Sequence, residues 1–358
     1  MLNNSDRRIC VVIPVYNAKK YLYEAVLSVL NQKYKKIEII LIDDGSCDGS
    51  SEICDNLAQR HERIFVIHQK NSGVSAARNA GIDYVLNKYD NNLKEIYVTF
   101  LDADDAWKPE WIDDHVIKQI KQNYDLIGFQ SCRCNSKLSR RSNPTGLKAG
   151  IYCGGNTSLW IHSTQHFGAM FYKCDLLAHY NIHFKKLKYS EDKIFSMTCM
   201  YLADRIYLDN HLMYYYRQNS TSAVYNRPYG ILYYAPILEA YIIWEKEMVK
   251  WGNESRGTLH EGTTLAQIYL KDMIDEHFQM GGRKGAIEEF LQNDFACQNI
   301  LKMTDTEDNF CSCIYIIINR GIGWKKKICR KIKEMSYFRQ IVDKIRYPIR
   351  LKNDIGRT

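Results

Sequence analysis

The amino-acid sequence predicts an α/β protein with a mainly parallel central sheet, followed by a helical C-terminal region. Three observations support this prediction. Short β-rich runs alternate with amphipathic segments over residues 1–130, as in chains built from βαβ units. The alternation stops beyond residue 131, and after Pro228 the apolar pattern is helical. We therefore expect a regular α/β half, a less regular second half and helices at the end.

The first strand–helix pair lies near the N-terminus. The apolar run Ile9–Val15 is rich in β-branched residues and predicts a buried strand. Asn17 is a favourable N-cap, so we expect a helix that it caps and that ends at Gln32. Four apolar residues recur at helical spacing on one face of that helix: Leu22, Val26, Val29 and Leu30.

Three further pairs and a fifth strand repeat this plan. The predicted strands are Ile37–Ile42, Ile64–Ile67, Ile96–Leu101 and Leu126–Gln130. The predicted helices are Ser50–His61, Gly73–Asn87 and Trp111–Asn123. Since strand and helix are joined by short connections, we expect parallel pairing with right-handed crossovers.

The second half of the chain is less regular. Ser131–Thr164 is polar and contains glycine, whereas Glu191–Leu202 predicts a helix. We expect two short strands, at Arg205–Leu208 and Met213–Arg217. Beyond a boundary near residues 226–228, the predicted helices are Tyr229–Trp251, Thr263–Met280 and Lys284–Gln292.

Composition excludes several classes of protein. Apolar residues make up 46% of the chain and charged residues 25%, which is typical of a globular protein with a full core. No run approaches the ~18 apolar residues that span a bilayer. The 12 cysteines include no Cys-x-x-Cys pair, so we expect neither a zinc site nor a disulfide framework, but a reducing cytoplasm. The 10 histidines have no metal-ligand or triad spacing and are expected to be structural or solvated.

The most informative segment is the acidic turn Leu101-Asp102-Ala103-Asp104-Asp105, which directly follows a predicted strand. Three carboxylates within four residues repel one another unless a cation joins them. Oxygen ligands suit Mg²⁺ or Mn²⁺. Open α/β sheets bind their ligands at the carboxyl ends of strands. The turn therefore predicts a metal that holds a phosphorylated donor.

Four segments occur in a characteristic order and spacing. They are Val12-Ile13-Pro14-Val15-Tyr16-Asn17, Leu41-Ile42-Asp43-Asp44-Gly45-Ser46, Asn71-Ser72-Gly73-Val74-Ser75-Ala76-Ala77-Arg78-Asn79-Ala80-Gly81 and the acidic turn. Together, over residues 8–225, they resemble the family 2 glycosyltransferases, and in particular those that build bacterial capsules and exopolysaccharides. The resemblance implies the Rossmann-like GT-A fold and an inverting, metal-dependent transfer of sugar from a nucleotide-sugar donor, expected to be a UDP-sugar.

The resemblance also implies which residues bind the donor. Pro14 and Tyr16 are expected to line the nucleotide pocket. One aspartate of the pair Asp43-Asp44 is expected to read the uracil or ribose, while the other caps the next helix. Asn71 belongs to the turn before a helix that carries a nucleotide-binding arginine.

That arginine is Arg78, whose guanidinium can reach the base or the diphosphate. The segment Asp102-Ala103-Asp104 matches the D-x-D element of the family. Asp102 is implied to face the ribose or the metal and Asp104 to bind the metal that bridges the diphosphate, with Asp105 as a further metal-binding carboxylate. The cofactor is expected to be Mn²⁺ or Mg²⁺, which would neutralise the leaving nucleoside diphosphate.

An inverting transfer also needs a carboxylate that takes the proton of the acceptor hydroxyl. The pair Glu191-Asp192 opens a predicted helix and resembles the E-D element of the family. The resemblance implies that Asp192 is this base and that Glu191 supports it or contacts the sugar. Arg217 is implied to contact the diphosphate from a mobile loop, although a plain strand end with a polar turn has the same pattern.

We divide the chain into four parts. Residues 1–130 are the nucleotide-sugar-binding half and 131–226 the acceptor-binding half of a GT-A domain, 227–323 form a helical region, and 324–358 form a basic amphipathic tail. Residues 324–352 hold eleven basic and two acidic residues, a net charge of +9, whereas the whole chain carries +8. The tail either lies on an anionic membrane, which brings the enzyme to a lipid-linked acceptor, or packs on the protein's own helices.

Two other functions share part of this pattern. A sugar nucleotidyltransferase has the same α/β plan, but its glycine-rich basic loop is replaced here by Tyr16-Asn17-Ala18. A non-catalytic scaffold that binds glycans or membranes would not need the intact Asp102, Asp104 and Asp192. No nucleic-acid motif is present, so we do not expect a nucleic-acid partner. The partners that the resemblance implies are a nucleotide sugar and a growing surface glycan. We expect a cytoplasmic protein, peripheral at the inner face of the cell membrane if the tail binds lipid.

Overall fold

The computed structural model describes residues 7–146, 148–154, 166–218, 228 and 230–249, together with single positions between 266 and 290. The chain divides into two compact units. One comprises Met1–Arg227 with Glu247–Leu259, and the other Pro228–Lys246 with His260–Thr358. The predicted basic tail lies outside the described residues, as does much of the predicted helices Thr263–Met280 and Lys284–Gln292.

Within the described residues, nine strands form one sheet in the order β3-β2-β1-β4-β8-β6-β9-β5, with β7 paired to β9. The strands are β1 (Arg8–Val15), β2 (Ile37–Asp43), β3 (Ile64–His68), β4 (Ile96–Phe100), β5 (Ala106–Trp107), β6 (Leu126–Cys134), β7 (Gly150–Tyr152), β8 (Met170–Lys173) and β9 (Ile206–Arg217). The pairs β1–β2, β1–β4, β2–β3 and β6–β9 are parallel. Every antiparallel pair among them involves β5, β7 or β8. The predicted α/β class, with its parallel N-terminal half, is confirmed.

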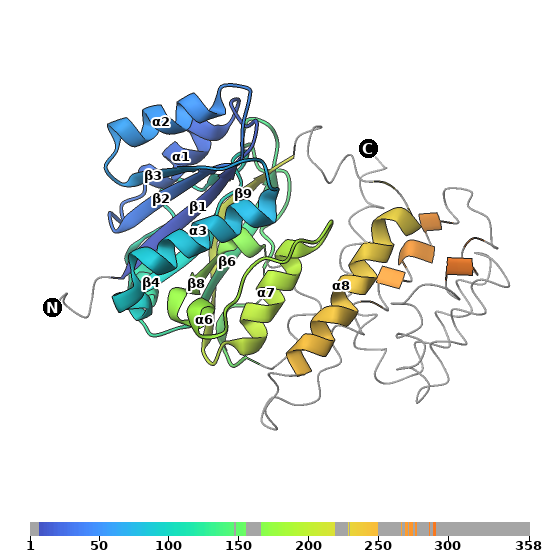
Figure 1. The fold of residues 1–358 in the computed structure, drawn as a ribbon. Coiled ribbons are helices and arrows are strands. Elements are labelled where there is room, and N and C mark those ends of the chain that lie inside the picture. The colour runs from blue at the N-terminus through green and yellow to red at the C-terminus, as the bar shows by residue number, and fades with distance from the viewer. Residues whose placement is uncertain are drawn as a thin grey trace, which may run out of the picture. The chain divides into compact units, whose positions relative to one another are not determined.

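The α-helices are α1 (Leu22–Leu30), α2 (Ser50–Arg60), α3 (Val74–Lys88), α4 (Asp114–Ile120), α6 (Cys174–His179), α7 (Glu191–Leu202) and α8 (Ile231–Val249). Two 3-10 helices, η1 (Asp90–Glu95) and η2 (Phe167–Ala169), complete the described elements. Figure 1 shows α3 lying across β1 and β4 on the face of the sheet turned to the viewer. There Gly81 faces Val12 so closely that an added Cβ would lie 2.3 Å from Val12 Cγ1. A glycine therefore allows this helix to pack against the central strand.

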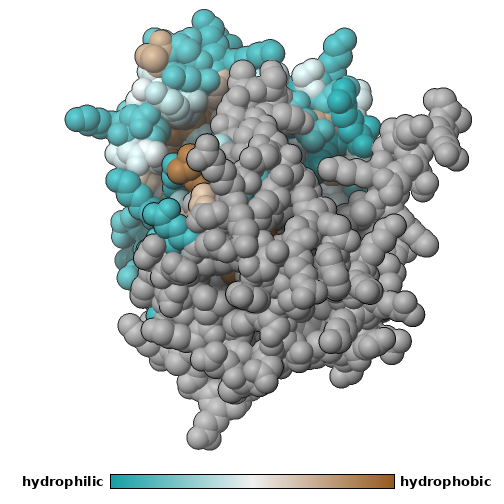
Figure 2. Space-filling model, turned by 90° about the vertical axis from the view of Figure 1, so that its right-hand side faces the viewer, coloured by the Kyte–Doolittle hydropathy of each residue, from teal (hydrophilic) through white to brown (hydrophobic). Residues whose placement is uncertain are grey.

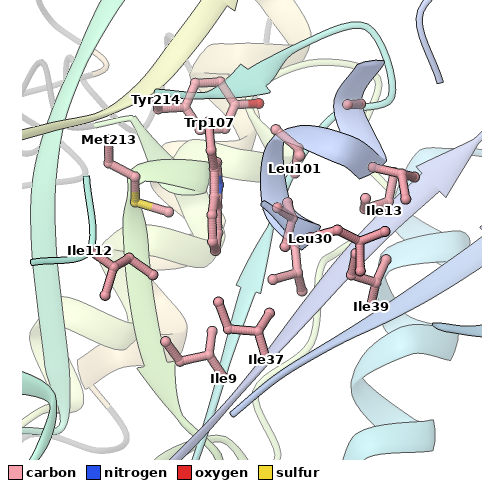
Figure 3. Packing of buried hydrophobic residues seen from close by; sticks show 14 of the residues in the cluster. Ile9, Ile13, Leu30, Ile37, Ile39, Leu101, Trp107, Ile112, Met213 and Tyr214 are labelled. Atoms are coloured by element: carbon pink, nitrogen blue, oxygen red, sulfur yellow. The ribbon is translucent and has the colours of Figure 1, made fainter. Parts of the chain in front are cut away.

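The opposite face of the sheet carries the larger core. Side chains alternate between faces along a strand, so Ile9, Val11 and Ile13 of β1 point away from Val12 and pack with the apolar face of α1. Figure 3 shows the indole of Trp107 standing between Met213 on one side and Leu101 on the other. The core thus joins the parallel half of the sheet to β5 and β9.

Several sequence expectations differ from the structure, and three of them concern helix starts and β9. Helix α1 begins at Leu22, and Asn17 does not cap it: its backbone is left-handed, and its side chain accepts a hydrogen bond from Cys47 N. Helix α4 begins at Asp114, because the side chain of Asp113 caps it through Val116 N. The two strands expected between 205 and 217 are a single strand, β9, which pairs with β6 on both sides of an irregularity that contains residues 209–211.

On the face drawn in Figure 2, the surface of the described residues is mainly polar. In the view of Figure 2 the coloured residues are mostly hydrophilic, with few hydrophobic ones among them. Among the described helices, none combines the length and apolar character needed to cross a membrane.

Candidate active site

The carboxyl ends of β1, β2 and β4 meet at one edge of the sheet, because these strands are parallel neighbours. The loop after β1 and the loop after β2 are tied together there. Ser46 accepts a hydrogen bond from Asn17 N at 3.1 Å, and Ser50 accepts one from Ala18 N at 2.9 Å. Tyr16 lies on this edge with 54% of its surface exposed. The loops therefore form a braced platform that presents an aromatic ring to solvent.

Asp43 and Asp44 both lie buried at the end of β2, and both accept hydrogen bonds from the protein. Asp43 accepts from Ser46 N, from the hydroxyl of Ser51 and from the ring of His68. Burial acts to raise the pKa of Asp43, but these hydrogen bonds outweigh it and hold that pKa below its usual value. The first aspartate of the pair is therefore an ionised anchor of the turn that leads into α2.

Asp44 shapes the turn before α3. Its Oδ1 accepts from Ser72 N at 2.8 Å, and its Oδ2 accepts from Gly73 N at 2.9 Å. Gly73 has φ +91°, a left-handed conformation that favours glycine. Asn71, in the same turn, is exposed. Asp44 thus fixes the backbone from which both Asn71 and the helix of Arg78 extend.

The acidic turn is held by β9. Asp105 is fully buried; its Oδ2 accepts from the hydroxyl of Tyr214 at 2.6 Å, and its Oδ1 accepts from Arg217 N at 2.7 Å. The same hydroxyl accepts a hydrogen bond from Asp102 N at 3.2 Å. Burial, and next the charges of Asp102 and Asp104, raise the pKa of Asp105 well above its usual value. Because both oxygens of Asp105 are already bound, its position suits a support of the turn rather than a metal ligand.

The side chain of Arg217 is also enclosed by protein. It is 1% exposed, and its Nε donates to the carbonyl oxygen of Asp104 at 2.5 Å. Its Nη2 forms an ion pair with Glu24 at 2.5 Å, its Nη1 donates to Ser136 O, and its guanidinium lies 4.3 Å from the ring centre of Tyr21. The guanidinium expected to contact a diphosphate from a mobile loop is therefore committed to holding the backbone of the acidic turn.

Arg78 connects two groups of acids. Its Nη2 donates to Asp102 Oδ1 at 2.9 Å, and its Nη1 donates to Glu191 Oε1 at 3.2 Å. The residue is 4% exposed, with the ring of Phe167 4.4 Å and that of Phe184 5.2 Å from its guanidinium carbon. One buried guanidinium group thus joins the acidic turn after β4 to the first turn of α7.

Glu191 and Asp192 open α7 as predicted, after Ser190 in a left-handed conformation. Both are half-buried, and negative groups are favoured at a helix N-terminus. Burial raises the pKa of Glu191, and the charge of Asp192 adds to this effect, while Arg78 acts against it. The pair is therefore held beside the acidic turn by the same arginine.

His166 is a neighbour of these acids that the sequence pattern did not single out. Its ring lies 4.3 Å from that of Tyr214, centre to centre, and its Nδ1 accepts from Gly168 N. Burial lowers the pKa of His166, although the charges of Asp102 and Asp192 act the other way. Neither His166 nor Tyr214 was expected as a site residue, because each reaches the acids only through the folded sheet.

Comparison with known proteins shows similarity to glycosyltransferases. The family model "Glycosyl transferase family 2" matches residues 10–181. The glycosyltransferase GlyA of Streptococcus pneumoniae is 39% identical over 121 residues, which cover 34% of this chain and 16% of that protein. TuaG of Bacillus subtilis, whose name assigns it to teichuronic acid biosynthesis, is 36% identical over 113 residues, which cover 31% and 42%. The chain thus spans less than half the length of these relatives.

A solved structure resembles a larger part of the chain. S. aureus TarS 1-349 in complex with UDP superimposes with a TM-score of 0.61 at 19% identity, covering 84% of this chain and 82% of the TarS 1-349 chain. The same protein in complex with UDP-GlcNAc gives a TM-score of 0.58. At this level of identity the likeness shows a shared fold.

Proposed function

We propose that the chain is an inverting glycosyltransferase of family 2, the family whose model matches residues 10–181. The donor is a nucleotide sugar, with a UDP-sugar as the first candidate, and the acceptor is a hydroxyl of a growing bacterial surface glycan. The TarS complexes with UDP and UDP-GlcNAc support the choice of nucleotide, since that protein shares the fold. The name of TuaG supports a surface polysaccharide as the product.

A single observation carries the proposal: Arg78 joins Asp102 to Glu191. Transfer of a sugar needs a group that stabilises the leaving diphosphate and a base for the acceptor hydroxyl, in one site. Asp102 lies on the turn proposed for the first task, and Glu191 precedes the residue proposed for the second. The shared arginine sets the spacing between them, and its burial leaves it little freedom to move.

On the donor side, Tyr16 offers an exposed ring on which a base can stack, next to Pro14 at the end of β1. Asp43 and Asp44 hold the loops on either side of the nucleotide, with Asn71 exposed on the second loop. Because both aspartates accept hydrogen bonds from these loops, their main role is to hold the loops in shape. Ala103, which is 6% exposed, keeps the backbone between the two acidic side chains close to the core.

The acidic turn fits a divalent cation through Asp102 and Asp104. Asp102 gives its Oδ1 to Arg78, which leaves its second oxygen for a cation, and Asp104 is half-buried on the same turn. Two carboxylates, together with phosphate oxygens and water, are ligands that Mg²⁺ and Mn²⁺ prefer. When bound, such an ion neutralises charge on the departing nucleoside diphosphate.

On the acceptor side, Asp192 is the proposed base. It takes the proton from the acceptor hydroxyl as the oxygen attacks the anomeric carbon from the face opposite the nucleotide, which inverts that centre. Asp192 lies in the first turn of α7, next to Glu191. Glu191 holds the arginine that positions the acidic turn. His166 packs against Tyr214, which supports the same turn.

The proposal is tested by separating donor binding from turnover in the full chain. With Mn²⁺ and a panel of nucleotide sugars, the active donor should release nucleoside diphosphate. A sugar nucleotidyltransferase would release none from them, and would form pyrophosphate only from a nucleoside triphosphate and a sugar 1-phosphate. Asp192→Asn should bind UDP as the wild type does but lose turnover, because only the proton acceptor is removed. Asp104→Ala should lose the Mn²⁺-dependent part of UDP binding.

The matched control is Asp175→Asn. Asp175 also lies in the first turn of a helix, α6, but this helix follows the end of β8 that pairs with Tyr97 near the start of β4. Asp175 is therefore a first-turn acid like Asp192, but it lies at the opposite ends of the strands from the acidic turn. Its replacement should leave turnover unchanged. Full activity of Asp192→Asn would refute the base assignment, and UDP binding that ignores Mn²⁺ would refute the metal site.

The basic tail supports a lipid-linked acceptor as part of this proposal. Its net charge of +9 over residues 324–352 suits an anionic membrane surface. The full chain should sediment with vesicles that contain anionic lipid, and a chain that ends at Lys325 should not. Equal recovery of the two proteins would favour packing of the tail on the protein itself.

A further inference from the structure

A second group of ligand-forming side chains lies between β9 and the start of α4. His115, Asp209 and His211 each bring one ligand atom to within 4.8 Å of the others. His115 Nε2 is 2.9 Å from Asp209 Oδ2, and His211 Nδ1 is 2.5 Å from Asp209 Oδ1. The two imidazole rings stack with their centres 5.3 Å apart. Two imidazole nitrogens and a carboxylate oxygen are therefore close enough together to bind one ion.

Two neighbouring side chains, Asp113 and Tyr207, form hydrogen bonds with this group. The other ring nitrogen of His211, Nε2, lies 3.1 Å from Asp113 Oδ2, and the hydroxyl of Tyr207 donates to Asp209 Oδ2 at 3.0 Å. A proton on Nε2 directed at Asp113 leaves the lone pair of Nδ1 facing the centre of the group. A carboxylate placed behind a histidine in this way is the common outer support of a histidine–metal bond.

The backbone of β9 explains why Asp209 and His211 point to the same place. Gly128 of β6 pairs with Leu208, but Gln130 pairs with Leu212, so the register shifts between them. The two ligands lie in the extra residues of this bulge, and bulges redirect side chains. His115 meets them from a position 94 residues earlier in the chain.

We propose that His115, Asp209 and His211 bind a divalent transition metal, with Zn²⁺ as the first candidate. Imidazole nitrogen selects zinc and its neighbours over Mg²⁺ or Mn²⁺, which distinguishes this site from the all-oxygen acidic turn. Zinc accepts three protein ligands with water as the fourth. The side chains of His115 and His211 are 48% and 35% exposed, so they can open by the small distance that a metal needs, while Asp209 is 4% exposed and fixed.

The position of the site suggests its effect. Tyr214, three residues after His211 on β9, holds Asp105 of the acidic turn. His115 follows that turn along the chain through β5. A metal at this site ties together two segments that flank the turn, so it should stabilise the folded protein and order the turn without entering the reaction.

The test uses the full chain, stripped with chelator, kept reduced and then loaded with Zn²⁺ alone. We expect one equivalent of zinc to remain after dialysis and to raise the melting temperature. His115→Asn and His211→Asn should each lose this equivalent and the rise in melting temperature. Asp113→Asn, which can still cap α4, should weaken zinc binding about 10- to 100-fold.

Two controls separate this site from others. His183→Gln replaces a histidine that has one carboxylate partner, Asp83 at 2.8 Å, and should keep the zinc. Asp104→Ala, which removes a proposed ligand of the acidic turn, should also keep it. X-ray absorption of the zinc-loaded wild type should show nitrogen and oxygen but no sulfur around the metal, and this measurement remains decisive if a histidine variant fails to fold.

Three results would overturn the proposal. They are retention of no zinc by the wild type, equal zinc in the wild type and both histidine variants, and sulfur in the coordination sphere. The first would mean that the cluster is a hydrogen-bonded His–Asp–His group, and the third would point to cysteines.

Discussion

Replacing Arg78 with lysine tests the link between the two groups of acids. The guanidinium reaches Asp102 with one terminal nitrogen and Glu191 with the other, at 2.9 and 3.2 Å. Lysine keeps the positive charge but has a single nitrogen on its stem. It can therefore bind one of the two acids in the wild-type geometry, but not both.

The magnitude follows from the burial of the site. Arg78 is 4% exposed, so water cannot replace the lost contact. One charge-assisted hydrogen bond in such a place contributes about 1.5–3 kcal/mol. If both acids must be in position in the transition state, this loss lowers kcat/KM about 10- to 150-fold, since 1.4 kcal/mol is a factor of ten.

The assay is release of nucleoside diphosphate by the full chain with its active donor, together with urea unfolding to confirm that the variant is folded. Arg8→Lys is the matched control. Arg8 pairs with Glu38 through one nitrogen at 2.6 Å, at the beginning of β1 and away from the acidic edge, so lysine can preserve that contact. A folded Arg78→Lys protein whose kcat/KM stays within threefold of the wild type would refute the linking role.

Three further predictions concern the fold around the site. Gly81→Ala should destabilise the protein by about 1–3 kcal/mol in urea unfolding, because its new Cβ would lie 2.3 Å from Val12 Cγ1; unchanged stability would mean that α3 packs less closely. Tyr214→Phe leaves a buried oxygen of Asp105 without its donor and should cost about 1–3 kcal/mol, again by urea unfolding, and a neutral result would contradict that bond. His68 has its pKa raised above 6.5 by hydrogen bonds with two aspartates, so its contribution is complete below pH 6.5 and is lost as the pH rises through the raised pKa. The difference in unfolding free energy between wild type and His68→Gln should therefore shrink above pH 6.5, and a difference that grows would show that the sign is wrong.

The secondary structure of the N-terminal half was largely predictable from local pattern. Strands β1, β2, β3 and β4 agree with the prediction to within one residue at each end. The apolar runs of β1, β2 and β4 are buried on both faces, whereas β3 is only partly buried. Where polar side chains have alternative partners, the prediction was wrong. Asn17 is a favourable cap, but its side chain binds a loop 30 residues away instead.

The roles of the acidic residues divide in the same way. The sequence predicts that these acids lie at the ends of strands, because an apolar run that stops at charged residues marks the end of a strand. It also predicts that Glu191 and Asp192 lie at the start of α7. The sequence does not predict which of these acids are accessible to a ligand. Asp104 and Asp105 are adjacent in the chain, yet Asp105 is fully buried and Asp104 half-buried.

By itself, the sequence determined the order of strands and helices, the placement of the motif residues and the likeness to family 2, because these depend on residues close together in the chain. The tertiary structure decided that one arginine joins Asp102 to Glu191, that β9 holds the acidic turn, and that His115 meets His211 beside a bulge. Arg78 and Asp102 are 24 positions apart, and the other contacts join residues 96 to 113 positions apart. They form only when sheet pairing and core packing bring distant segments together, and no local pattern encodes such a meeting.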